Sequence, residues 1–98
     1  EIYFSAYPRG KYASRAYLFL GKSYLGQFKL DDAARLFDDG SRLFSRTLEG
    51  HKCRYKRAVV DLLRGDRAAA LARFATLADH PDGPLAPEAR AFQQYLAD

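Results

Sequence analysis

Apolar and small residues recur at helical spacing in the first third of the chain. Positions three, four and seven apart share one face of a helix, which we expect over residues 13–26. The members of this face are Tyr17, Leu20, Gly21 and Tyr24. A glycine inside a helix costs about 1 kcal/mol relative to alanine. We therefore expect a second helix to come close at Gly21, with the small residue Ala33 opposite it.

The charges of the next segment indicate a second helix and its direction. We expect this helix over residues 30–46. Asp31 and Asp32 fall in its first turn, where carboxylates suit the positive end of the helix dipole. Arg42 and Arg46 fall near its other end, where cations are favoured.

Similar patterns predict three more helices. An amphipathic stripe consists of Tyr55, Ala58, Val59, Leu62 and Leu63. Gly65 and Asp66 then form a turn and a cap for an alanine-rich helix over residues 67–79. A last stripe predicts a terminal helix over residues 85–97 and consists of Ala89, Phe92 and Leu96.

A shift of 37 residues superposes similar positions, which we interpret as an internal repeat. The matched pairs are Ala33 with Ala70, Phe37 with Phe74, Gly21 with Ala58, and Leu25 with Leu62. The second copy is degenerate, because Arg57 stands at the place of Leu20 and Asp61 at the place of Tyr24.

The first copy resembles the tetratricopeptide repeat. Its motif, Trp-x2-Leu-Gly-x2-Tyr followed by Ala-x3-Phe, is matched by Tyr17 in the Trp place, Leu20, Gly21, Tyr24, Ala33 and Phe37. The resemblance implies an all-α fold: a short right-handed solenoid of helical hairpins, with residues 1–98 as a single domain. Residues 13–46 and 51–80 would be its two repeats. Residues 85–97 would be a terminal helix, either a cap or the start of a third repeat.

We interpret residues 1–8 as the tail of a preceding helix that ends at Pro8. Because the chain starts at Glu1 and contains no Met, we expect a fragment of a longer array. The linker is similar to that of bacterial envelope tetratricopeptide proteins, such as the outer-membrane assembly lipoprotein and the periplasmic Tol-Pal coordinator. The residues that carry this similarity are Tyr7, Pro8, Gly10, Ala13 and Ala16. It implies a scaffold in the periplasm or cell envelope, with the cytoplasm as the alternative.

The net charge of +4 is concentrated in one segment. Residues 42–57 carry a single acidic residue, Glu49, and six basic ones: Arg42, Arg46, Lys52, Arg54, Lys56 and Arg57. Clustered Lys and Arg can neutralise phosphates, so nucleic-acid binding through this basic joint is one hypothesis. We rank it behind protein binding, because the cluster crosses an interhelix loop and Tyr55 alone is a poor stacking platform. No apolar run approaches the length of a membrane span.

The sequence carries no catalytic motif, and we expect neither an enzyme nor a cofactor. His51 and Cys53 could offer two metal ligands, with His80 a distant third. Zinc sites need three or four protein ligands, so we expect no metal site. Cys53 is the single cysteine and cannot form an intrachain disulfide; we expect it to be a small packing residue.

In the family that this chain resembles, the first helices of the hairpins line a concave groove. The matching positions are Arg15, Leu18, Lys22, Leu25, Lys52, Tyr55, Lys56, Val59 and Leu62. An apolar floor with basic flanks suits an amphipathic helix or extended segment of a partner that brings Leu-type anchors and acidic residues. Two alternatives stay open: the chain or its neighbouring repeats cover this floor, or the array self-associates through its repeat ends.

Overall fold

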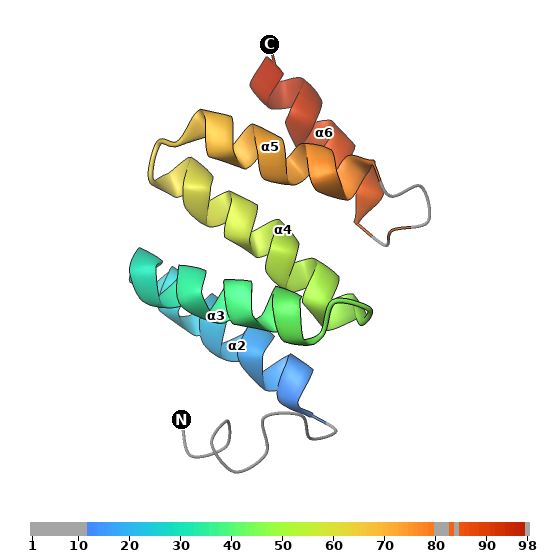
Figure 1. The fold of residues 1–98 in the computed structure, drawn as a ribbon. Coiled ribbons are helices and arrows are strands. Elements are labelled where there is room, and N and C mark those ends of the chain that lie inside the picture. The colour runs from blue at the N-terminus through green and yellow to red at the C-terminus, as the bar shows by residue number, and fades with distance from the viewer. Residues whose placement is uncertain (1–11, 80–82, 84, 98) are drawn as a thin grey trace.

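The computed structural model describes residues 12–79, 83 and 85–97. The regular structure of these residues is entirely α-helical (Figure 1). The helices are α2 (Ala13–Gly26), α3 (Leu30–Leu43), α4 (Leu48–Leu63), α5 (Arg67–Ala78) and α6 (Ala86–Ala97). The all-α fold class is thus confirmed. The expected helix tail at residues 1–8 lies outside the described residues.

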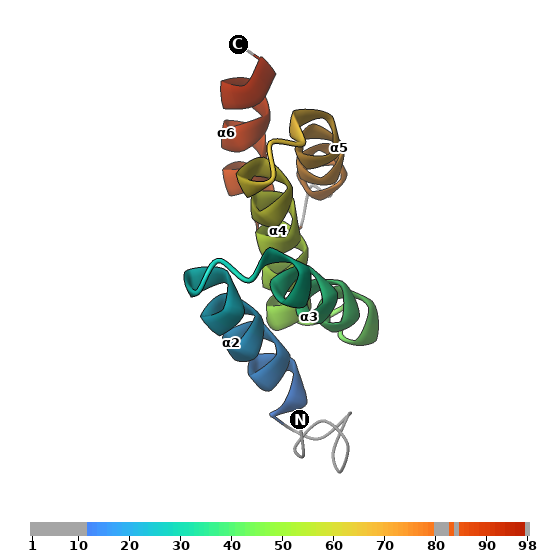
Figure 2. The same cartoon turned by 90° about the vertical axis from the view of Figure 1, so that its left-hand side faces the viewer.

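The helices are arranged in two layers. α2 pairs with α3, α4 pairs with α5, and α6 packs against α5. In Figure 2, α2, α4 and α6 follow one another along one side of the molecule, and α3 and α5 lie on the other. α2 also contacts α4 directly, so both helices of the first hairpin pack against α4. The result is a flat body with principal extents of 45 × 30 × 15 Å.

The joint between α3 and α4 differs from the expected helix limits. α3 ends at Leu43 rather than at residue 46. Thr47 caps α4, because its Oγ1 accepts a hydrogen bond from the Gly50 N–H at 3.0 Å and donates one to the Phe44 carbonyl at 2.8 Å. The cap ends the connecting turn at Thr47 and lets α4 begin at Leu48, three residues before the start at residue 51 expected for the second repeat.

The turns inside the two hairpins have the same backbone geometry. The N–H of Lys29 bonds to the carbonyl of Tyr24 at 2.9 Å, and that of Asp66 bonds to the carbonyl of Asp61 at the same distance. This six-to-one bond is typical of a Schellman turn, which needs one residue with positive φ. Phe28 (φ 59°) and Gly65 (φ 81°) supply it, and they lie 37 positions apart in the chain.

The first core cluster lies among α2, α3 and α4. Its buried members are Ala33, Ala34, Phe37, Cys53 and Val60. Gly21 is a packing glycine, as expected, but the group opposite it is not Ala33. A Cβ at Gly21 would stand 2.5 Å from Cε1 of Phe37, because the aromatic ring lies directly on the backbone of α2. Ala33 is buried in the same cluster.

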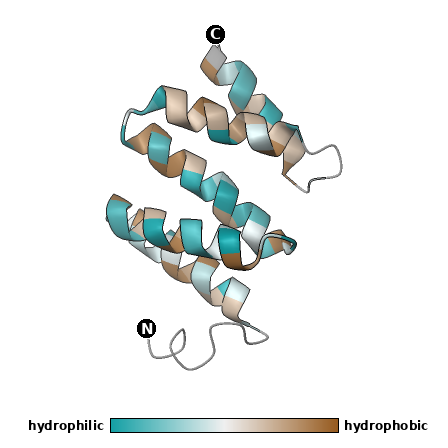
Figure 3. Ribbon diagram, viewed as in Figure 1, coloured by the Kyte–Doolittle hydropathy of each residue, from teal (hydrophilic) through white to brown (hydrophobic). Residues whose placement is uncertain are grey.

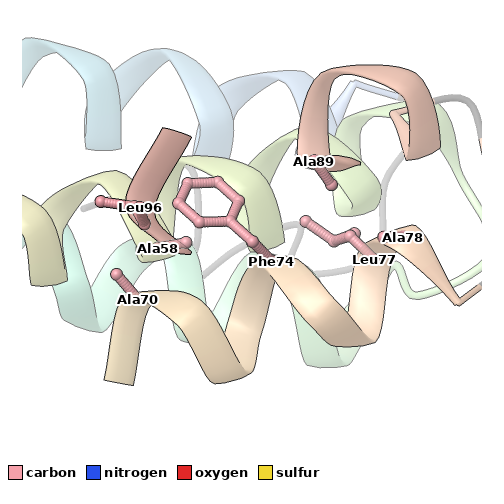
Figure 4. Close-up of a cluster of buried hydrophobic side chains, with 7 residues drawn as sticks. All are labelled: Ala58, Ala70, Phe74, Leu77, Ala78, Ala89 and Leu96. Carbon is pink, nitrogen blue, oxygen red and sulfur yellow. The ribbon is translucent and has the colours of Figure 1, made fainter. Parts of the chain in front are cut away.

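The second core cluster lies among α4, α5 and α6 (Figure 4). Its buried members are Ala58, Ala70, Phe74, Leu77, Ala78, Ala89 and Leu96. Phe74 is fully buried, as is Phe37 at the matching position of the first hairpin. Most of α5 is coloured tan to brown in Figure 3, because it consists mainly of alanine and leucine. This composition suits its position between α4 and α6.

Cys53 is the contact point between α3 and α4. It is 1% exposed, and a Cβ at Gly40 would stand 2.6 Å from its sulfur. Burial, with a smaller contribution from Glu49, raises the pKa of the Cys53 thiol to about 12. Cys53 is therefore a small packing residue, as the sequence predicts.

A buried carboxylate joins α4 to α5. Asp61 is 4% exposed and accepts hydrogen bonds from Arg57 Nη1 at 2.5 Å and from Arg73 Nε at 2.7 Å. Burial lowers the pKa of Arg57, but its hydrogen bonds to Asp61 and Asp38 outweigh this effect and raise the pKa overall. The two residues that depart from the repeat motif, Arg57 and Asp61, thus compensate each other.

Candidate functional site

Five of the nine residues predicted to line the groove meet in one pocket of about 260 Å³ between α2 and α4. We call it the lysine pocket; the described residues that line it are Leu18, Lys22, Lys52, Tyr55, Lys56 and Leu85. Each helix supplies apolar and basic members on the same face. Leu18 and Lys22 lie one turn apart on α2, and so do Lys52 and Lys56 on α4.

Leu85 is the lining residue that the sequence analysis missed. It immediately precedes α6, outside both helices to which the groove was assigned. It reaches the pocket because α6 packs beside α4, as the contact between Tyr55 and Phe92 shows. The available signal was weak: Leu85 is the single leucine of the linker between α5 and α6.

The lysine pocket combines an apolar floor with three lysines. Lys22 and Lys52 are exposed and Lys56 is half-buried. Of the carboxylates in the part of the chain that the structure describes, none forms a salt bridge with these three lysines. A nearby negative charge is Glu88, which, after burial, is the second cause of the raised pKa of Tyr55. The pocket therefore offers net positive charge above an apolar surface.

Tyr55 belongs both to the pocket and to the second core cluster. Its ring makes edge-on contacts with Phe74 and Phe92, at centroid distances of 5.6 and 5.7 Å. These two rings stack on each other at 4.8 Å. The floor of the pocket is thus held in place by the packing of three helices rather than by a single side-chain rotamer.

The other four predicted residues lie elsewhere. Leu25 packs against the first core cluster, whereas Val59 and Leu62 pack against the second. Arg15 lies near Glu49, with its Nε atom 3.9 Å from a carboxylate oxygen, and its guanidinium is 6.0 Å from the centre of the Tyr12 ring. Part of the apolar floor of the predicted groove, at Val59 and Leu62, thus packs against other helices of the chain itself.

The basic joint does not form one continuous surface. Lys52 and Lys56 line the lysine pocket, whereas Arg54 and Arg57 line a second pocket together with residues of α3 and α5. Residues two positions apart on a helix point in nearly opposite directions, about 200° around the axis. Arg42 pairs with Asp39 at 2.9 Å. The cations of the basic joint therefore do not share one face of α4.

Within the described residues, no cluster of three or more His, Cys, Asp or Glu side chains is suited to a metal ion. His80 lies outside these residues. None of the described helices has the length and apolar character needed to cross a membrane.

No protein family, curated protein or solved structure matches this chain.

Proposed function

We propose that this chain is a non-catalytic scaffold that binds an acidic and apolar segment of a partner protein in the lysine pocket. The observation that carries the proposal is the meeting of three lysines around Leu18, Tyr55 and Leu85. None of the three pairs with a carboxylate of the described residues. An apolar cavity with a few convergent polar groups is the usual form of a binding site.

The chemistry of the pocket determines what the segment must contain. A leucine-type anchor would fill the apolar floor and remove its surface from water. Aspartate or glutamate residues beside the anchor would pair with the ammonium groups of Lys22, Lys52 and Lys56. Because these ammonium groups are solvent-accessible, they would mainly accelerate association and fix orientation, and affinity would fall as salt is added.

We further propose that the two hairpins are tetratricopeptide-type repeats within a longer solenoid. The support is the shared geometry of their turns at a spacing of 37 residues and the matching buried positions of Phe37 and Phe74. Stacked repeats present a continuous surface to a partner, which suits a scaffold. Action in a bacterial envelope assembly, and self-association through the repeat ends, stay predictions.

The test is a selection of random-sequence peptides displayed on phage against the purified chain. We expect the enriched sequences to combine a leucine-type anchor with nearby Asp or Glu. A labelled synthetic peptide of the enriched sequence then gives the dissociation constant by fluorescence anisotropy. The Lys52→Glu, Lys56→Glu double variant should weaken binding by about tenfold or more, since close charge pairs are converted to repulsive ones.

The matched control is Arg46→Glu combined with Arg67→Glu. Both arginines are exposed and outside the lysine pocket, and the change in net charge is the same. Retained binding in this control, with loss in the lysine variant, supports the proposal. An equal loss of affinity in both double variants would contradict the proposal, because it would show that only the net charge of the chain matters. Enrichment of basic or purely apolar peptides would contradict the proposed partner chemistry.

A further inference from the structure

A second pocket lies on the other side of α4 from the lysine pocket. Its volume is about 160 Å³, and its described lining residues come from three successive helices: Ser41 of α3, Arg54 and Arg57 of α4, and Arg73 and Thr76 of α5. We call it the arginine pocket. Its charged lining residues are three guanidinium groups, and its other lining groups are two hydroxyls.

Two of the three arginines are held in fixed positions by carboxylates outside the lining. Arg57 contacts Asp38 through Nε at 3.1 Å and Asp61 through Nη1 at 2.5 Å. Arg73 contacts Asp61 through Nε at 2.7 Å, and its Nη1 atom is 3.8 Å from Asp38. These contacts use Nε and Nη1 of each side chain. Among the described residues, they leave Nη2 of both guanidinium groups as further donors.

Arg54 is the third cation and has no acidic partner within the described part of the chain. Two carboxylates therefore balance two of the guanidinium groups, and the charge of Arg54 remains. The hydroxyls of Ser41 and Thr76 donate to the main-chain carbonyls of Asp38 and Ala72, at 2.9 and 3.1 Å. Each hydroxyl can exchange this hydrogen bond for one to an anion in the pocket, because rotation about the C–O bond redirects its proton.

We propose that the arginine pocket binds a phosphate-type oxyanion. Guanidinium groups offer paired, planar donors that match the oxygens of phosphate. The pocket joins two arginines held in position by carboxylates with Arg54, which has no acidic partner among the described residues. The lining mixes charged and neutral donors, as a tetrahedral group with several oxygens requires. The oxyanion is either free phosphate or the phosphate of a modified side chain on a partner. The site is separate from the lysine pocket, so either proposal can fail without the other.

The test is a titration of the isotope-labelled 98-residue chain with inorganic phosphate, followed by amide NMR at constant ionic strength maintained with chloride. We expect saturable shifts at Ser41, Arg54 and Thr76. Arg54→Gln should weaken binding by about tenfold or more, which is the loss expected for one charge-assisted hydrogen bond. Arg54 forms no ion pair with the described residues, and an unchanged melting curve would verify that the variant is folded.

Two further variants separate geometry from charge. Arg46→Gln removes the same charge at an exposed position outside the pocket and should leave the affinity unchanged. Thr76→Val removes a donor without any change of charge and should weaken binding severalfold. Shifts that do not saturate, or equal weakening by Arg54→Gln and Arg46→Gln, would overturn the proposal.

A second arm distinguishes the sources of the oxyanion. The probes are N-acetyl phosphoserine amide and its unphosphorylated counterpart. Tighter binding of the phosphorylated compound than of inorganic phosphate supports a modified side chain as the ligand. Affinity equal to that of inorganic phosphate supports the free anion. Equal binding of both serine compounds would overturn phosphate recognition.

Discussion

The ring of Phe37 lies on the backbone of α2 so closely that a Cβ at Gly21 would stand 2.5 Å from Cε1 and 2.8 Å from Cδ1. Gly21→Ala would normally favour a helix by about 1 kcal/mol. Here the ring must move, and overpacking of this kind costs about 1 to 3 kcal/mol. We expect a net loss of roughly 1 kcal/mol in the free energy of unfolding, measured in urea. Gly26→Ala is the control: no atom lies within 4 Å of its Cβ, so stability should be unchanged or slightly higher. Stabilisation by both substitutions would contradict the close contact.

Phe28 and Gly65 supply the same left-handed residue in two turns, but only one of them suits it. A non-glycine residue pays about 1 to 2 kcal/mol in this conformation. Phe28 is 64% exposed and loses little packing on replacement. Phe28→Gly should therefore raise the free energy of unfolding by roughly 0.5 kcal/mol, after the larger chain entropy of glycine is counted. Gly65→Ala should lower it by about 1 kcal/mol. Thermal unfolding of both variants checks the opposite signs; destabilisation by Phe28→Gly would indicate that its ring contributes to packing.

The helices followed from the sequence because their signals are local. The spacing of apolar residues predicted α2. The acidic residues at the start of α3 and the basic residues near its end predicted α3. The missed helix limit at α4 also had a local signal, because Thr47 is a good cap residue followed by Glu49 in the first turn. The sequence alone did not show whether the helix begins at this cap or closer to the apolar stripe, which starts later at Tyr55.

The residues that line the two pockets could not be predicted from the sequence alone, because the pockets form only when the helices pack together. Leu85 reaches the lysine pocket through the packing of α6, and Arg73 meets Asp61 across a turn, twelve residues along the chain. The resemblance to the tetratricopeptide repeat also assigned Val59 and Leu62 to the groove, although they do not line the lysine pocket and pack against the core formed with α5 and α6. A sequence pattern identifies the apolar face of a helix, but it does not show which side of that face a neighbouring helix covers.

The buried position of Asp61 makes its substitution costly. Asp61→Ala leaves Arg57, whose side chain is 13% exposed, without its closest acidic partner. Removing one member of a buried ion pair typically costs about 3 to 5 kcal/mol. Asp31→Ala is the matched control, because Asp31 also pairs with an arginine, Arg64, but its side chain is 90% exposed. We expect a loss below about 0.5 kcal/mol there. Similar losses for the two variants in urea unfolding would contradict a buried role for Asp61.

Because the pKa of Cys53 is raised, the free energy of unfolding depends on pH in the alkaline range. Between its ordinary value of 9.0 and about 12, the unfolded chain loses the thiol proton while the folded chain retains it. The folded state then binds more protons, so the free energy of unfolding falls as pH rises, with a slope of about 1.4 kcal/mol per pH unit. Below the ordinary pKa the contribution is fully present.

The measurement compares wild type with Cys53→Ala in urea at a series of pH values. Other groups titrate in the same range, so the difference between the two proteins isolates the thiol. We expect the stability advantage of wild type to decrease steadily above pH 9, the region set by the ordinary pKa of 9.0. Parallel pH profiles would show that Cys53 ionises as easily in the folded chain as in the unfolded one.

The position of Tyr55 between pocket and core makes the terminal helix part of the binding equilibrium. Departure of α6 would remove Phe92 from one side of the tyrosine and Leu85 from the wall of the lysine pocket. Only the docked form then offers a complete floor, so the apparent affinity equals the intrinsic affinity multiplied by the docked fraction. By the same linkage, a ligand in the lysine pocket favours the docked position of α6. The mobility of α6 therefore reports on binding between α2 and α4.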